Sequence, residues 1–202
     1  NCINNGDITM TFPAITAASD YLGGVVGNTS MADASSVAVE NCINNGDLTF
    51  TVKGASKNVY LGGISGACNS KGVINNCINN GAVVYNFIAG GSGAYPNVGG
   101  IVGYCADTLL SVEDCVNGSA TDATKGVVTV GTAPSGVGLG GILGLAEKAT
   151  TVSGCINYGT VTQTGKGGKN DTYRPHLGGI VGINSVGYIT ITDCKNYGTV
   201  CY

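Results

Sequence analysis

The sequence predicts an all-β protein of the β-solenoid class, in which successive coils of one chain stack around a single continuous interior. Three observations predict it: a cysteine-containing heptad recurs, a Gly-Gly motif recurs between its copies, and short β-branched segments join the two. Such recurrence is typical of stacked repeats, because one unit cannot bury its apolar face alone. About five coils and a partial sixth are expected, with little or no helix.

The heptad NCINNGD opens the chain at Asn1–Asp7 and returns unchanged at Asn41–Asp47, with a close copy at Asn76–Ala82. Aligned on its cysteine, the repeat starts six times, at intervals of 40, 35, 38, 40 and 39 residues. These cysteines are Cys2, Cys42, Cys77, Cys115, Cys155 and Cys194. We therefore interpret the chain as one domain, 1–202, with repeats 1–40, 41–75, 76–113, 114–153, 154–192 and a partial repeat 193–202.

An asparagine stands two positions after each of these cysteines. The six are Asn4, Asn44, Asn79, Asn117, Asn157 and Asn196. Stacked coils place equivalent side chains above one another, so these amides are expected to form a hydrogen-bonded ladder, and the cysteines a parallel buried column. The heptad glycines, such as Gly6, are expected to supply a positive φ. In the fourth copy Gly118 comes one position early, which predicts a different corner there.

The second recurring motif is a Gly-Gly pair, one in every full repeat, in segments such as LGGVVG and LGGIVG. Residues without a Cβ suit a crowded corner or a close approach of two sheets. Neither a Walker pattern nor Gly-x-Gly-x-x-Gly before a helix is present, so no phosphate cradle is predicted. The corner glycines are Gly23, Gly24, Gly62, Gly63, Gly99, Gly100, Gly140, Gly141, Gly178 and Gly179.

Between these motifs lie β-branched segments such as DITMTF, DLTFTV and YITIT. Their period of two predicts about three strands per repeat, and no segment shows helical spacing. Repeat length varies mainly between the cysteine and the Gly-Gly pair, in segments rich in Gly, Ser, Asn and Pro that predict surface loops. The threonine-containing strands are not expected to share one register.

The composition excludes two classes of partner. Charged residues are 10% of the 202 residues, and the formal net charge is −3. Nothing forms the basic patch that nucleic acids require. No apolar run reaches the roughly 18–20 residues of a membrane helix, so no membrane insertion is expected within this segment. The chain starts inside a repeat, which we interpret as a mature product or an excised fragment.

No catalytic, cofactor or metal site is predicted. The repeated cysteines are too far apart for Cys-x-x-Cys metal pairs, and the only histidine, His176, is interpreted as an uninvolved loop residue beside Tyr173 and Arg174. Cys68 and Cys105 share a second register and are the candidate disulfide pair.

The alternation of NCINNG and a strand with LGGIVG resembles the GLUG-type and related Cys-Asn-Gly repeats of large secreted or surface-anchored bacterial proteins, including adhesin-like proteins. The similarity extends over essentially all 202 residues, and its motifs are short and glycine-rich. The resemblance implies a right-handed β-helix that serves as a stalk, spacer or adhesive surface. No catalytic residue is carried over, because none belongs to the motif.

The sequence thus predicts a non-enzymatic structural or adhesive β-solenoid, extracellular or on the cell surface, that presents variable loops. Expected partners are a second copy stacked end to end into filaments, or the continuation of a longer solenoid, because end coils expose strand edges. Host or matrix glycans or proteins are further expected partners. The alternative is a carbohydrate-binding or polysaccharide-cleaving β-helix module with Tyr158 and Tyr197 as glycan contacts. An ice-binding surface ranks third.

Overall fold

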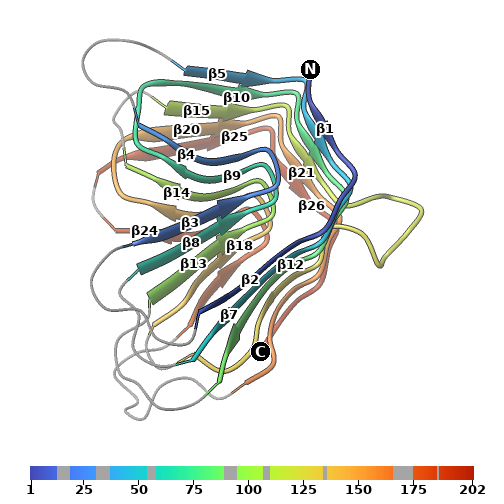
Figure 1. Cartoon of the computed structure of the whole chain (residues 1–202). Helices are drawn as coiled ribbons and strands as arrows, with labels where there is room; N and C mark the ends of the chain where they lie inside the picture. Colours follow the sequence, from blue (N-terminus) through green and yellow to red (C-terminus); the bar gives the residue numbers. More distant parts are fainter. Residues whose placement is uncertain are drawn as a thin grey trace.

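The computed structural model describes residues 1–12, 19–30, 37–53, 58–88, 95–106, 110–133, 136–165, 175–185 and 187–202. Within these ranges all the regular elements are β-strands, and every strand pairs in parallel with its counterpart in the next repeat. The prediction of an all-β solenoid is therefore confirmed (Figure 1). The described part of the chain contains no helix long and apolar enough to cross a membrane.

Each coil contributes one strand to each of five sheets, which we name A to E in chain order. Sheet A contains β1 (Ile3–Asn4), β6 (Ile43–Asn44), β11 (Ile78–Asn79), β16 (Val116–Asn117), β21 (Ile156–Asn157) and β26 (Lys195–Asn196). Sheet B contains β2 (Ile8–Phe12), β7 (Leu48–Val52), β12 (Val83–Phe87), β17 (Val128–Val130), β22 (Val161–Gln163) and β27 (Val200–Cys201).

The remaining three sheets have five strands each. Sheet C contains β3 (Asp20–Gly23), β8 (Asn58–Gly62), β13 (Tyr95–Gly99), β18 (Gly138–Gly140) and β23 (His176–Gly178). Sheet D contains β4 (Val26–Thr29), β9 (Ser65–Cys68), β14 (Val102–Cys105), β19 (Leu143–Ala146) and β24 (Val181–Asn184). Sheet E contains β5 (Val37–Glu40), β10 (Gly72–Asn75), β15 (Leu110–Glu113), β20 (Thr150–Ser153) and β25 (Ile189–Thr192).

The expectation of about three strands per repeat is wrong, because both recurring motifs divide the chain more finely. The heptad forms a short strand of its own in sheet A, and the Gly-Gly corner separates a strand of sheet C from one of sheet D. Five or six strands per sheet agree closely with the expected number of coils. Repeats of unequal length stay in register, since the differences fall between sheets B and C, between sheets D and E, and after Asn117.

The interior is divided in two, and the expectation of a single continuous interior is wrong. One apolar cluster lies between sheets B and C and includes Leu48, Phe50 and Leu61. The other lies between sheets D and E and includes Ile101 and Ile142 together with the cysteine column. The cause is the corner between sheets C and D, which points inward toward sheet A instead of outward (Figure 1).

The prediction of positive φ at the heptad glycines is wrong. Gly46 and Gly81 lie outside the left-handed region, and they are glycines because the coils stack closely: a Cβ on Gly46 would lie 2.0 Å from the carbonyl oxygen of Gly6. The positive φ, between 49° and 63°, falls instead on the residue before the cysteine. Asparagine, aspartate and glycine tolerate this conformation best. These residues are Asn41, Asn76, Asp114, Gly154 and Asp193.

The fourth corner differs from the others, as predicted. Gly118, with a φ of 84°, leads into an insertion at 119–125 that projects from the solenoid (Figure 1). Gly126 then takes the place of the heptad glycine, and its carbonyl oxygen accepts a hydrogen bond of 2.7 Å from Nδ2 of Asn117. The insertion is therefore added without interrupting the asparagine column.

Candidate functional site

The structure places the six repeated asparagines in one column on sheet A. Nδ2 of each donates to Oδ1 of the next, over 2.7 Å from Asn4 to Asn44 and 2.8 Å at the four later steps. The same nitrogen also donates to a glycine carbonyl oxygen of its own coil, as from Asn79 to Gly81. The four central amides are fully buried. Their donors are thus satisfied without water, as buried amides require.

The Gly-Gly corners lie against this column from inside the coil. A Cβ on Gly63 would lie 2.2 Å from Cγ of Asn79, and one on Gly100 would lie 2.3 Å from Cγ of Asn117. The first glycine of each pair is equally restricted, because a Cβ on Gly62 would lie 2.0 Å from the carbonyl oxygen of Ser65. The two motifs recognised in the sequence therefore meet, and their contact holds the corner inward.

Five of the six repeated cysteines form a column of thiols in or against the D–E cluster, whereas Cys2, in the first coil, is exposed. Sγ of Cys42 and Sγ of Cys115 each donate to the carbonyl oxygen two residues earlier, over 3.2 Å. All nine cysteines of the chain are free thiols. Among the described residues, no group of three or more His, Cys, Asp or Glu side chains could hold a metal ion.

The candidate disulfide between Cys68 and Cys105 is absent from the structure, although the two residues are register partners in sheet D. Strands that pair in parallel hold both side chains in the same orientation, which does not provide the crossed torsion of a disulfide. Burial raises the pKa of the Cys68 thiol to about 11 and raises the pKa of Cys105 well above its ordinary value. Both thiols are therefore poorly reactive.

The tyrosines expected to contact glycans stack on each other. The rings of Tyr158 and Tyr197 have centroids 5.2 Å apart and an interplanar angle of 11°. Tyr158 is half-buried, whereas Tyr197 is 63% exposed. Tyr173 and Arg174 lie outside the described residues. His176 begins β23, and its exposed side chain lines a hollow on another face of the solenoid.

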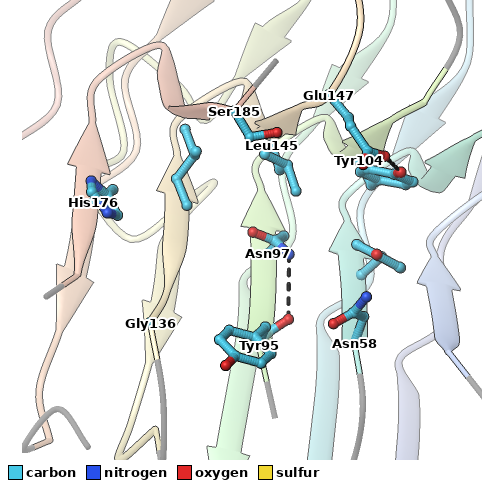
Figure 2. Close-up of a pocket in the computed structure, with 11 residues that line it drawn as sticks. Asn58, Tyr95, Asn97, Tyr104, Gly136, Leu145, Glu147, His176 and Ser185 are labelled. Atoms are coloured by element: carbon cyan, nitrogen blue, oxygen red, sulfur yellow. Dashed lines mark hydrogen bonds between the residues drawn. The ribbon is translucent and has the colours of Figure 1, made fainter. Parts of the chain in front are cut away.

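This hollow is a groove of about 490 Å³ on the outer side of sheets C and D (Figure 2). It exists because the inward corner makes the outer faces of the two sheets converge on a concave surface. Its volume falls within the range typical of small-ligand sites. The lining residues are Asn58, Tyr60, Tyr95, Asn97, Tyr104, Gly136, Leu145, Glu147, His176, Ile183 and Ser185.

One wall of the groove is a stack of aromatic rings. Tyr60 stacks on Tyr21 at a centroid distance of 5.4 Å and on Tyr104 at 4.3 Å. The hydroxyl of Tyr104 donates to the carboxylate of Glu147. Among the described lining residues, Glu147 is the one carboxylate, and neither lysine nor arginine occurs. Most of these described side chains are aromatic or uncharged and polar.

The expectation that the threonine strands do not share a register is wrong for sheet B. Thr9, Thr49, Thr129 and Thr162 occupy one column on its outer face, interrupted by Val84. The segment ITIT lies in sheet E instead, as β25. The column arises because unequal repeats are brought into register by their connections, which sequence spacing alone does not reveal.

The groove was missed in the sequence, although one signal indicates it. The residue immediately before the Leu-Gly-Gly or Val-Gly-Gly segment differs in almost every repeat, whereas the motif after it is constant. These residues share one outward column across the coils. They are Tyr21, Tyr60, Asn97, Gly138 and His176. Variation at an outward position beside an invariant corner marks a surface that the scaffold leaves unconstrained.

Comparison with protein-family models, curated proteins and solved structures found no match to this chain. The resemblance to GLUG-type repeats therefore stays a prediction.

Proposed function

We propose that this chain is a non-enzymatic, structural or adhesive β-solenoid, extracellular or on a cell surface, that presents its groove and variable loops to partners. One observation carries the proposal: the residues that recur in every repeat bond the coils together. The asparagines hydrogen-bond along the stack, and the corner glycines leave room for the asparagine side chains because they have no Cβ. The buried cysteines fill part of the interior. Recurrence is thereby explained by architecture, which leaves the variable outer surface for recognition.

The stack is suited to bearing load. Each buried ladder amide makes its hydrogen bonds inside the protein, and losing one partner would leave a buried polar group unsatisfied, at a cost of roughly 1–3 kcal/mol. Separation of two neighbouring coils would break the ladder bond between them together with the backbone pairing of the sheets. A solenoid of this kind resists local opening, which favours a role as a stalk or spacer.

The groove favours presentation over catalysis. Its carboxylate, on Glu147, already accepts a hydrogen bond from Tyr104, and the described lining residues include no second carboxylate. The pair of carboxylates that glycoside hydrolysis generally uses is therefore not assembled among these described residues.

The end coils support association with a further coil of the same kind. The ladder is polar: each Nδ2 donates toward the C-terminal side, so Asn4 retains acceptor capacity and Asn196 retains a donor. A second copy stacked head to tail would continue the column, and so would further coils of a longer solenoid. Light scattering of the isolated 202-residue chain tests stacking: mass should rise with concentration, and a strictly monomeric particle would contradict it.

A retention assay tests the main proposal. Beads coated with the chain should be retained on surfaces coated with cells, matrix proteins or polysaccharides, and the purified chain should release no reducing ends from those polysaccharides. A heat-denatured sample is the control for both readings. Release of reducing ends in proportion to chain concentration, or retention no greater than that of the denatured sample, would contradict the proposal.

A further inference from the structure

We propose that the groove between sheets C and D is a binding site for an uncharged pyranose sugar, presented as a free oligosaccharide or as the end of a glycan. This inference deepens the proposed function, because it names the chemical class of partner that the solenoid presents itself to. It rests on the shape of the groove, on one buried amide and on the charges of the lining residues.

In sheet C, the fourth coil presents glycines to the groove. Its strand passes between the strand carrying Tyr95 and Asn97 and the strand carrying His176, and the fourth coil contributes Gly136 to the lining (Figure 2). In the same column, Gly138 stands between Asn97 and His176. Two strand spacings, roughly 9.5 Å, therefore separate these two flanking residues. This spacing places one polar residue on each side of the glycine.

The floor of the groove contains a buried amide directed at this space. A Cβ on Gly138 would lie 2.6 Å from Oδ1 of Asn97 and 2.9 Å from Cδ1 of Ile183, so both side chains lean over the glycine. Asn97 is 5% exposed, and its Nδ2 donates to the carbonyl oxygen of Tyr95 over 3.3 Å. Among the described residues nothing donates to its Oδ1. A ligand hydroxyl in the groove would donate to this oxygen.

The rim combines an aromatic surface with groups that both donate and accept. Tyr95 is 40% exposed at the mouth of the groove, and it offers an apolar ring to the C–H face of a sugar. Ser185 and His176 are exposed at the opposite side. Among the described lining residues, Glu147 is the single charged group, so an uncharged ligand needs no compensating charge from them. A pyranose carries several hydroxyls and has an apolar C–H face, so it would match both the polar side chains and the tyrosine ring of the groove.

A glycan array followed by calorimetric titration tests the site. The array carries neutral oligosaccharides beside sialylated, sulfated and uronic acid-containing ones, and the neutral oligosaccharide bound most strongly is then titrated into the intact chain. Tyr95→Ala and His176→Ala should each raise the Kd by roughly tenfold or more, since each removes about one contact. Tyr188→Ala, which changes an exposed tyrosine outside the groove, is the matched control and should change the Kd by less than about twofold.

Two results would overturn the inference: binding limited to acidic glycans or absent, or affinity retained in both groove variants. If the two groove variants melt at the same temperature as the control variant, their loss of affinity is not caused by unfolding. If no sugar is bound while coated beads are still retained on protein surfaces, the sugar site is wrong and the proposed function stands. If the sugar is bound and shortened, the site stands and the non-enzymatic function is wrong.

Discussion

Asn79 and Asn117, 38 residues apart in the sequence, are joined inside the protein by a hydrogen bond of 2.8 Å from Nδ2 to Oδ1. Both side chains are fully buried, and the corner glycine Gly100 lies directly against Asn117. This contact turns the corner inward, divides the interior into two clusters and shapes the groove on the outside. The interior ladder and the exterior site are therefore consequences of one packing arrangement.

Removing a ladder amide should destabilise the protein strongly. Asn79→Ala leaves one of the two N–H groups of the Asn44 amide without an acceptor, and leaves Oδ1 of Asn117 without its donor. Both groups are buried, so a loss of roughly 2–5 kcal/mol in the free energy of unfolding is expected. Urea denaturation followed by circular dichroism measures it. The matched control is Asn80→Ala, whose amide donates to Asn45 in an exposed ladder and should cost less than about 0.5 kcal/mol. Equal losses would contradict the buried ladder.

A methyl group at the corner should be tolerated far less than one outside it. Gly100→Ala would place a Cβ 2.2 Å from the carbonyl oxygen of Gly141, where backbone must move, so a loss of at least roughly 3 kcal/mol or failure to fold is expected. Gly27→Ala meets its nearest atom at 3.5 Å and should change the stability by less than about 1 kcal/mol. Thermal melting of the two variants compares them, and similar melting temperatures would rule out the close corner.

The nine thiols should react in three groups with a thiol-specific reagent at pH 8. Cys2 and Cys201 are exposed and should react first, followed by the half-buried Cys194. The buried thiols should react only as the protein unfolds, since reaction requires an accessible thiolate. Peptide mapping by mass spectrometry assigns the groups, and reaction of all nine at one rate would mean that the interior is open. The protected cysteines are Cys42, Cys68, Cys77, Cys105, Cys115 and Cys155.

Stability should fall in alkaline solution. Burial raises the pKa of Cys68 from 9.0 to about 11, so the unfolded chain loses this proton first as the pH rises. The thiol's contribution is complete below pH 9 and is lost between pH 9 and about 11, by roughly 3 kcal/mol. Urea midpoints measured in reductant from pH 7 to 10.5 test this. Cys68→Ala should flatten the decline, whereas Cys201→Ala should not, and identical profiles for all three proteins would contradict it.

The repeated motifs allowed the stack to be predicted, because the same residue type recurs in successive repeats where the coils contact each other. Asn44 and Asn79 align in the sequence and meet in space. The position of the positive φ was misplaced onto Gly46, although Asn41 and Asp114, both tolerant of that conformation, stand before the cysteine in the same repeats. The residue types that tolerate a positive φ were therefore present before the cysteine. The positive φ was nevertheless assigned to the heptad glycine, because glycine tolerates that conformation too.

The groove could not be predicted in the same way. It depends on the corner turning inward, and that turn follows from contact between Gly100 in one coil and Asn117 in the next. Neither residue's sequence neighbours reveal the contact, since both motifs also suit an outward corner. Asn97 and His176 come together only through the register of sheet C, across repeats with different connections.

The most direct test of the stacked arrangement is the nuclear Overhauser spectrum of the asparagine side-chain amides. The side-chain amide protons of Asn79 should show cross-peaks to those of Asn44 and Asn117, and none to those of Asn157, two coils away. They should also exchange with solvent far more slowly than the side-chain amide protons of Asn80, which is only partly buried. Rapid exchange at Asn79, with no cross-peak to either neighbouring repeat, would contradict the structure at its central contact.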